Sequence, residues 1–564
     1  MMSVRPGPWP EVPEETARVA RAAFPRGSLP MRLRDELGGL FDDADLAGVY
    51  GIRGRPGLSP AQLAVVTVLQ FTENLTDRQA ADAVRARIDW KYCLGLDLAD
   101  HGFDYSVLSE FRERLAAGGQ ERLLLDLQLR RLKEAGLVAA RMRQRTDSTR
   151  VLARIRDLNR LELAGEAVRA ALEALAAAVP GWLAGIIDAS WQDAYGQRVC
   201  DLRLPEGKEA RARLAQRFAR DGYHLLEQAV APGAPPAARE LPALEALRLV
   251  LIQQFYRDDG PGGRTVRWRE DGQDGLPPGR SRLVSPYDLD ARYGEKRGEK
   301  WLGYKAHYSE TVPDPARDDP DTGMPEHPSL VTGTETTHAS VPDAVMASVI
   351  HDHLEQAGLP PGEHLTDSGY ASADVLIAAR ARGITLVAPL MTDTRWQARA
   401  GGHTTAAFAI DFDARQATCP QGVTTSRWTP ATQAGTSVIV IGFPRTACQD
   451  CPDRGKCTTA TRGGRQLTIR PREVHEAVTA ARAEHQTAQW KARYASRAGV
   501  EGLMRQATHV TGIRRARYLG LPKTTLEHNI AAAAINLIRL DAWWTGTPLD
   551  RGHPGNLQRL NLAA

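Results

Sequence analysis

Hydrophobic residues recur at helical spacing through the first quarter of the chain, once a Pro-rich start is passed. Residues 1–30 are rich in proline and show no clear period, so we interpret them as a flexible arm. Residues 31–136 predict a helical N-terminal domain, in which Ser59-Pro60 and the capping box Thr76-x-x-Gln79 mark two helix starts. A further helix is expected near residues 107–115.

A strand is expected next, over residues 142–152, with Asp147 near its middle. Residues 156–281 then predict a helical insertion, because leucine and valine repeat at three- and four-residue steps over 158–175. The end of this insertion, residues 260–281, is rich in Gly, Pro and charge and is expected to form a linker or exposed loop.

From residue 301 the pattern changes to strands that alternate with helices. Strands are expected at 301–311, 328–336 and 384–390, and helices at 341–357 and 372–382, with a short strand leading into Asp367. This alternation indicates an α/β sheet with crossover helices. Residues 401–473 contain further strand-like pieces, 474–508 form a long helical stretch, and Thr524-x-x-Glu527 is expected to cap a final helix.

Length and composition point to an ordinary globular protein of several structural units. The chain has 564 residues, of which 42% are hydrophobic and 25% are charged, and its net charge is only +4. We find no apolar run near the roughly 18 residues that a membrane span needs, and no apolar segment of the kind a signal peptide carries. A cytoplasmic location without a membrane partner is therefore expected.

Three acidic residues stand out, although each has an ordinary alternative. Asp147 lies mid-strand among arginines and suits either a cation site or a surface ion pair. Asp367 lies at the carboxyl end of a strand, where ligand sites of α/β sheets occur, but Asp is also a favoured helix cap. Residues 491–520 contain seven basic residues and one acidic residue, Glu501. Glu501 is expected to share one helix face with Tyr494 and Arg497. Together, two strand aspartates and a helix glutamate form a recurrent carboxylate site for two divalent ions.

At this point the sequence resembles the DDE transposases of bacterial insertion sequences, in the group with the signature Y-x2-R-x3-E-x6-K. The most specific matching piece is RYASRAGVEGLMRQATHVTGIRRARYLGL, at residues 493–521. Other matching pieces are QRTDSTRV, SPYDLDARYGEK with WLGYKAH, HLTDSGYAS, and the N-terminal LSPAQLAVVTVLQFTENLTDRQAADAV. The resemblance covers most of residues 30–540.

The resemblance implies an α/β fold: an RNase H-like mixed sheet flanked by helices, over residues 137–155, 282–400 and 474–545. It also implies that Asp147, Asp367 and Glu501 are the catalytic triad and hold two Mg²⁺ or Mn²⁺ ions. Tyr494 and Arg497 correspond to the family's DNA-contacting pair. One position departs from the signature, because its Lys is Thr508 here. Further basic or polar residues are expected to contact DNA: Lys305, Arg505, His509, Arg514 and Arg515.

Four of the six cysteines fall within 39 positions, as Cys419, Cys448, Cys451 and Cys457. In a cytosolic protein this spacing suggests a structural Zn²⁺ site in a β-rich insertion at 401–473. Reduced cysteines in a core or on the surface, and a redox role, are the alternatives. Cys93 and Cys200 are isolated and are interpreted as plain core residues.

The leading functional hypothesis is a bacterial transposase that acts on double-stranded DNA, at terminal inverted repeats and at a target, as a homodimer near the nucleoid. The N-terminal helices suit a DNA-binding or dimerising module, and equally a bundle without direct contact to DNA. A nuclease of the same fold without strand transfer, and a non-catalytic DNA-binding relic, are the alternatives.

Overall fold

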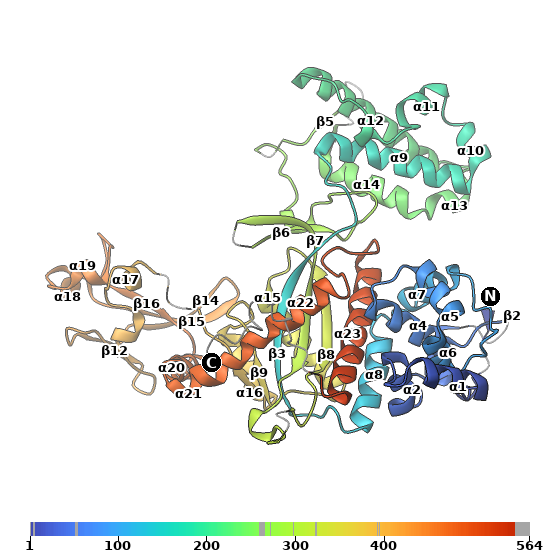
Figure 1. Ribbon diagram of the computed structural model, residues 1–564. Coiled ribbons are helices and arrows are strands. Elements are labelled where there is room, and N and C mark those ends of the chain that lie inside the picture. Colours follow the sequence, from blue (N-terminus) through green and yellow to red (C-terminus); the bar gives the residue numbers. More distant parts are fainter. Residues whose placement is uncertain are drawn as a thin grey trace, which may run out of the picture. The chain divides into compact units, whose positions relative to one another are not determined.

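The computed structural model describes residues 2–3, 6–50, 55–258, 265–270, 272–296, 298–321, 324–391, 393 and 395–547 (Figure 1). Parts of the expected arm and of the expected loop 260–281 lie outside the described residues. The chain forms two compact units, one of residues 1–139, 147–341 and 500–564, and one of residues 140–146 and 342–499. We refer to them as unit 1 and unit 2. Packing alone does not define domains, so the predicted domain limits stay predictions.

Helices fill the N-terminal part of unit 1, as predicted. The caps are confirmed: Ser59 accepts the backbone N–H of Gln62, and Thr76 forms a capping box with Gln79. The elements are β1 (Met2–Ser3), α1 (Glu14–Ala23), α2 (Leu29–Leu37), α3 (Asp43–Leu46), β2 (Arg55–Pro56), α4 (Pro60–Thr72), α5 (Asp77–Ala86), α6 (Ile88–Leu94), α7 (Ser106–Ala117) and α8 (Leu123–Glu134).

The interpretation of residues 1–30 as a flexible arm is wrong for α1. Two small residues, Thr16 and Ala20, lie one turn apart on this helix and are fully buried. The hydroxyl of Thr16 donates to the carbonyl of Leu96, and Ala20 packs in a cluster with Met31 and Tyr92. The period of α1 is clear, but its buried face consists of small residues and the prolines nearby concealed it.

The sheet of unit 1 is built on two antiparallel pairings of the long strand β7. Its strands are the second part of β3 (Arg143–Leu152), β6 (Arg292–Lys296), β7 (Glu299–Thr311) and β8 (Val331–His338). Strand β7 pairs with β6 through its first residues and with β8 through its later ones. Gly303 has φ +148°, and a Cβ there would lie 2.2 Å from the carbonyl oxygen of Val151. Only glycine therefore lets β7 approach β3 so closely.

Helix α23 (Leu521–Trp544) packs on β8 and α4 at the centre of unit 1 (Figure 1). The predicted cap at Thr524 is wrong, because the helix begins at Leu521 with Pro522 in its first turn. The Thr524 hydroxyl donates to the carbonyl of Gly520, and Glu527 accepts the backbone N–H of Arg517. The Glu527 carboxylate therefore bonds to Arg517, outside the helix, and does not make the capping-box contact that the local pattern predicts.

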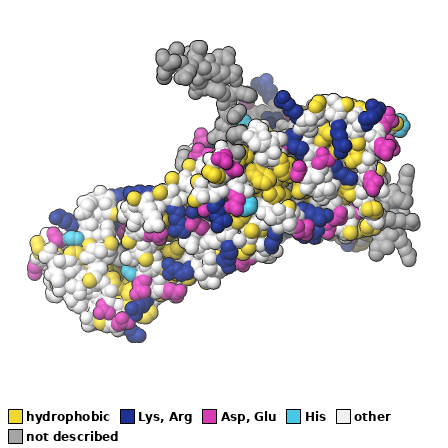
Figure 2. Space-filling view, turned by 60° about the horizontal axis from the view of Figure 1, so that its bottom comes forward, with side chains coloured by type: hydrophobic (Ala, Val, Ile, Leu, Met, Phe, Trp, Pro, Cys, Tyr) yellow, Lys and Arg dark blue, Asp and Glu magenta, His cyan; other side chains and the backbone are white. Residues whose placement is uncertain are grey.

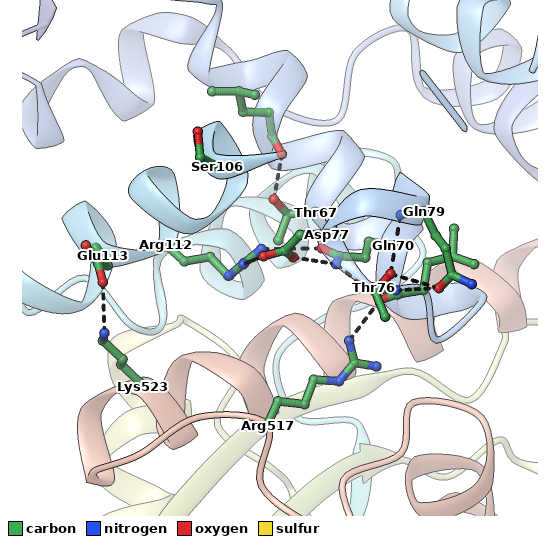
Figure 3. A network of polar contacts seen from close by, with 12 residues as sticks. Thr67, Gln70, Thr76, Asp77, Gln79, Ser106, Arg112, Glu113, Arg517 and Lys523 are labelled. Carbon is green, nitrogen blue, oxygen red and sulfur yellow. Dashed lines mark hydrogen bonds and ion pairs between the residues drawn. The ribbon is translucent and has the colours of Figure 1, made fainter. Parts of the chain in front are cut away.

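A polar network joins the N-terminal helices to the segment that precedes α23 (Figure 3). Arg517 donates to the carbonyl of Leu75 at 3.2 Å and stacks over the ring of Phe71. Asp77 accepts from Arg112 at 2.6 Å and from Gln70 at 2.8 Å. Residues more than 400 positions apart therefore belong to one packed body.

The insertion after β3 has its own hydrophobic core, as its leucine stripe predicts. Its elements are α9 (Arg160–Ala178), α10 (Pro180–Ala184), α11 (Ala189–Tyr195), α12 (Lys208–Val230), α13 (Pro236–Arg239), α14 (Pro242–Gln254), β4 (Phe255–Asp258) and β5 (Thr265–Trp268). The expected loop is partly a hairpin, because β4 and β5 pair antiparallel and Phe255 stacks on Trp268 at 4.4 Å.

Unit 2 combines a parallel strand pair with two small antiparallel sheets. Strands β9 (Glu363–Leu365) and β10 (Thr385–Val387) are parallel, and β9 pairs in parallel with the first part of β3. Helices α15 (Asp343–Gln356) and α16 (Ala373–Ala381) confirm the predicted alternation. The remaining elements are α17 (Trp396–Arg399), β11 (Ala409–Asp411), β12 (Gln416–Thr418), β13 (Thr424–Thr425), β14 (Trp428–Gln433), β15 (Thr436–Gly442), α18 (Arg445–Gln449), α19 (Arg454–Cys457), β16 (Gln466–Ile469), α20 (Arg472–Glu484) and α21 (Ala488–Ala495).

The mixed sheets and their covering helices confirm the α/β class and are consistent with the RNase H-like fold. No helix of the described residues has the length and apolarity that a membrane crossing requires.

Candidate active site

Asp147 is the fifth residue of β3, as the sequence predicts. Its neighbours Gln144 and Thr146 are buried, whereas Asp147 is half-buried on the other face of the strand. The carboxylate accepts the backbone N–H of Ser148 at 2.8 Å. The strand thus presents an oriented carboxylate at the partly open face of the sheet.

Asp367 follows the carboxyl end of β9 by two residues, also as predicted. Its Oδ1 accepts the backbone N–H of Gly369 at 2.8 Å. A Cβ on Gly369 would lie 2.9 Å from that oxygen and 3.6 Å from Oδ2 of Asp343, the first residue of α15. Asp343 therefore borders the same glycine as Asp367. Sequence reasoning missed Asp343, which has the position of an ordinary acid in the first turn of a helix.

Three buried residues of unit 2, each of which comes before Asp147 or Asp367 in the sequence, form a chain of hydrogen bonds. The hydroxyl of Thr146 lies 2.6 Å from Nε2 of His364, and Nδ1 of His364 lies 2.8 Å from Nε2 of His351. Burial lowers the pKa of His351 to about 4 and the pKa of His364 well below its usual value. Both rings are therefore neutral near pH 7, and the chain ties β3 to β9 and α15. No local sequence pattern signals it.

Glu501 is exposed and is the second residue of α22 (Val500–His509). The predicted helical stretch over 474–508 is not one regular helix, because α21 ends at Ala495 and a 3₁₀ turn at Ser496–Gly499 separates it from α22. Tyr494, Arg497 and Glu501 therefore do not share one regular helix face. Ser496 and Gly499 both favour the break, since the Ser496 hydroxyl donates to the carbonyl of Arg493 at 2.8 Å.

The 3₁₀ turn is held by a hydrogen bond from Arg145 of β3. The guanidinium of Arg145 donates to the carbonyl of Ser496 at 2.7 Å. A Cβ on Gly499 would lie 2.2 Å from Nη1 of Arg145, so this glycine leaves room for the guanidinium. Tyr494, on the preceding helix, stacks on Trp490 with 4.9 Å between ring centroids.

The basic residues predicted to contact DNA are mostly exposed. Arg505, His509, Arg514 and Arg515 are exposed on α22 and on the segment after it. The Thr508 hydroxyl donates to the carbonyl of Met504, one turn back, at 2.8 Å. The position of the signature's Lys is therefore occupied by an uncharged side chain, whose hydroxyl is hydrogen-bonded to the backbone of its own helix.

A hollow of about 460 Å³ opens in unit 1 beside the residues that follow Asp147. We call it the basic hollow, because four of its lining side chains are basic and one is acidic. Its lining residues are Ser148, Thr149, Arg150, Lys296, Glu299, Trp301, Lys305 and Arg514. Arg150 forms an ion pair with Glu299, and Lys305 donates to the carbonyl of Val341 at 2.6 Å.

Arg514 reaches this hollow because its segment pairs with the end of β3. The N–H of Leu152 donates to the carbonyl of Arg514 at 2.9 Å, and the N–H of Ala516 donates to the carbonyl of Leu152 at 2.8 Å. Basic and acidic side chains are interspersed on the face seen in Figure 2. The basic hollow, with four basic lining side chains against one acidic one, is suited to an anionic ligand.

The four clustered cysteines of unit 2 line one small cavity, together with His403 and Asp453. All six cysteines are free thiols. In the described part of the chain, no group of three or more His, Cys, Asp or Glu side chains is arranged so that it could hold a metal ion. Asp147 and Glu501 belong to unit 1, and Asp367 belongs to unit 2.

Two segments of the chain match known protein families. Residues 418–541 match the transposase DDE domain, and residues 20–114 match a transposase domain of otherwise undefined role, DUF772. The first match includes Glu501 and the clustered cysteines, and the second covers α2 to most of α7. No curated protein sequence and no solved structure matches the chain. The two matched segments confirm the resemblance to DDE transposases of insertion sequences.

Proposed function

We propose that this protein, with transposase domains at both ends of its chain, is an active transposase whose triad is Asp147, Asp367 and Glu501. It binds the terminal inverted repeats of an insertion sequence, cuts the DNA at these ends, and joins the 3′-hydroxyls to a target. We further propose that it acts as a homodimer on DNA of the bacterial nucleoid, in the cytoplasm.

The observation that carries the proposal is the register of β3 and β9. The strands are parallel, and Arg145 is the partner of Leu365 in the ladder. Asp147 and Asp367 each follow these partners by two positions. The register thus fixes where each aspartate lies relative to its own strand. We infer from the family resemblance that both aspartates act with Glu501 in one reaction.

The chemistry of the donors suits Mg²⁺ or Mn²⁺, since all three side chains offer carboxylate oxygens. Two such ions, when bound, would lower the pKa of the attacking water or 3′-hydroxyl and stabilise the leaving oxygen. The hydrogen bonds from Ser148 and Gly369 orient the aspartates before any ligand arrives. This orientation reduces the reorganisation that binding requires.

Basic and aromatic side chains of both units would hold the DNA backbone. Tyr494 and Arg497 take the role of the family's DNA-contacting pair. The exposed Arg505, His509 and Arg515 offer further contacts, and the basic hollow with Lys305 and Arg514 has the charge and size for a phosphate group.

The test is cleavage of DNA that carries the element's own ends, by the full-length protein with Mg²⁺ or Mn²⁺, with products mapped on both strands. We expect metal-dependent nicks at the ends followed by joined products. Asp147→Asn, Asp367→Asn and Glu501→Gln keep side-chain shape and should each lower the rate by more than about 100-fold, beyond the loss typical of outer-shell residues.

Matched controls are available for two of the acids. Glu473, like Glu501, is an exposed second residue of a helix, so Glu473→Gln should cleave normally. Asp100, like Asp367, accepts the backbone N–H of a glycine two residues later in the sequence, at 2.7 Å, so Asp100→Asn should also cleave normally. Cleavage without joining would favour the nuclease alternative, and DNA binding without cleavage in either metal would favour the non-catalytic one.

A further inference from the structure

The cysteine cavity of unit 2 has a volume of about 30 Å³, more than the roughly 10–15 Å³ that one water needs. Cys419 reaches it from the turn after β12, Cys448 from α18, Cys451 from the loop after it, and Cys457 from the end of α19. Burial raises the pKa of the Cys457 thiol, and the three other cysteines lie near enough to add to this effect.

Hydrogen bonds tie the cysteine-bearing segments together around the cavity. Asp453 accepts from Gln421 at 2.7 Å and lies 3.0 Å from Nε2 of His403, which joins the Cys419 turn to the loop between Cys451 and Cys457. The backbone N–H of Arg465 donates to the sulfur of Cys448 at 3.4 Å. Backbone donors to sulfur favour the thiolate over the thiol.

A buried cation lines the same cavity without an anionic partner. Arg465 is only 7% exposed, and within the described residues it forms no ion pair. Its Nη1 donates to the carbonyl of Cys457, but its buried Nε has no hydrogen-bond partner in the described part of the chain. A buried guanidinium without a counter-charge is unfavourable, so the cavity favours a ligand with negative charge.

The segment around the cavity has a small hydrophobic core. Its two three-stranded sheets enclose one cluster of six buried hydrophobic residues: Phe408, Ala417, Ile441, Phe443, Leu467 and Ile469. Cys419, Cys448 and Cys457 pack against this cluster. Small β-rich segments with so few core residues commonly depend on a metal or disulfide for stability.

We propose that Cys419, Cys448, Cys451 and Cys457 bind one structural Zn²⁺ ion as thiolates, in a tetrahedral site whose net negative charge is partly offset by Arg465. Each thiol releases its proton to solvent when its sulfur bonds to the ion, so no oxidant or reductant takes part. The four thiols line the cavity but are not arranged as a ligand set, so binding requires their side chains to change rotamer. His403 stays engaged with Asp453 and serves to hold the loop.

The first test measures zinc and free thiols in the full-length protein purified without chelator. We expect one zinc ion per chain, and four thiols that react with a thiol reagent only after a strong chelator removes the zinc. Replacement of zinc by Co²⁺ should give the absorption bands of a tetrahedral thiolate site. Absence of zinc together with four reactive thiols, or cysteines paired as disulfides, would overturn the proposal.

Single substitutions locate the site. Cys451→Ser and Cys457→Ser should lose zinc and make the 403–470 segment more sensitive to proteolysis, whereas Cys200→Ser, an isolated cysteine, should keep both properties. Arg465→Met should weaken zinc retention in competition with a chelator. If a cysteine variant fails to fold, the cobalt spectrum of the wild-type chain still decides, and a spectrum without thiolate bands contradicts the proposal. The result is independent of DNA cleavage, so the two proposals fail separately.

Discussion

The two strand carboxylates and the helix carboxylate of the proposed triad are held in different ways. Asp147 and Asp367 are half-buried, and each accepts a backbone N–H close by in sequence. Thr146, just before Asp147, and His364, three residues before Asp367, are fully buried and hydrogen-bonded to each other. Glu501 is exposed, and its helix starts after a 3₁₀ turn that depends on one arginine.

In the proposed triad, the strands would therefore supply rigid ligands and the helix an adjustable one. A carboxylate bound to backbone and resting on a buried network loses little freedom when it binds a cation. An exposed helical glutamate can change rotamer at small cost. Perturbations of the strand region should therefore cost more activity than comparable perturbations of the helix region.

Among substitutions outside the triad, Gly369→Ala gives the largest expected effect. The new Cβ would lie 2.9 Å from Oδ1 of Asp367, so the carboxylate must move. We expect cleavage to fall by roughly 10–100-fold, the range of outer-shell changes at metal sites. Initial cleavage rates measure this, with Gly181→Ala as control, because a Cβ there meets nothing within 4 Å. An unchanged rate would show that the orientation of Asp367 is unimportant.

The buried histidine pair predicts that unit 2 loses stability in mild acid. The pKa of His351 is lowered by burial to about 4, below its unfolded value, so the unfolded chain binds protons first as the pH falls. Stability is complete above about pH 6.5 and declines toward pH 4, by about 2 kcal/mol between pH 6.5 and 5 for this one group.

Hydrogen exchange of the β9 amides at pH 7 and 5 measures this loss, because exchange reports the opening free energy of a local unit. His351→Asn should be less stable at pH 7 and should show a smaller decline. His224→Asn, at a half-buried histidine of the helical insertion, should leave the decline unchanged. A wild-type profile that is flat over this range would contradict a neutral buried pair.

Gly499→Ala probes the helix region in the same manner as Gly369→Ala probes the strands. Its Cβ would displace the Arg145 guanidinium, which is the flexible end of a long side chain. The cost is about 1 kcal/mol for the lost hydrogen bond, equivalent to a roughly fivefold effect on activity. Cleavage rates of both variants under one set of conditions rank them, and a greater loss for Gly499→Ala would reverse the comparison.

The smallest expected effect concerns the exposed cations of α22. If Arg505 contacts a phosphate, Arg505→Ala should reduce the slope of log K against log salt by about 0.9. Thr508→Lys, which restores the signature's charge, should increase the slope by the same amount. Binding to element-end DNA over a salt series measures both, and Arg203→Ala, in an exposed ion pair of the insertion, is the control.

Local patterns predicted many of the elements but not the contacts between distant segments. The caps at Ser59 and Thr76, the strand with Asp147 and the strand end at Asp367 were readable because side chains within three residues decide them. The Thr146–His364–His351 chain was not readable, because its members lie 218 and 13 positions apart. The cap at Thr524 was misread for the same reason, since Glu527 bonds to Arg517 instead.

The most direct measurement of the central claim is a change of metal preference by Asp367→Cys. A thiolate is a softer ligand than a carboxylate and favours Mn²⁺ over Mg²⁺. If Asp367 binds the catalytic ion, the variant should be inactive in Mg²⁺ and recover cleavage in Mn²⁺, while the wild-type protein is active in both. Full activity of the variant in Mg²⁺ would contradict the assignment of Asp367 as a metal ligand.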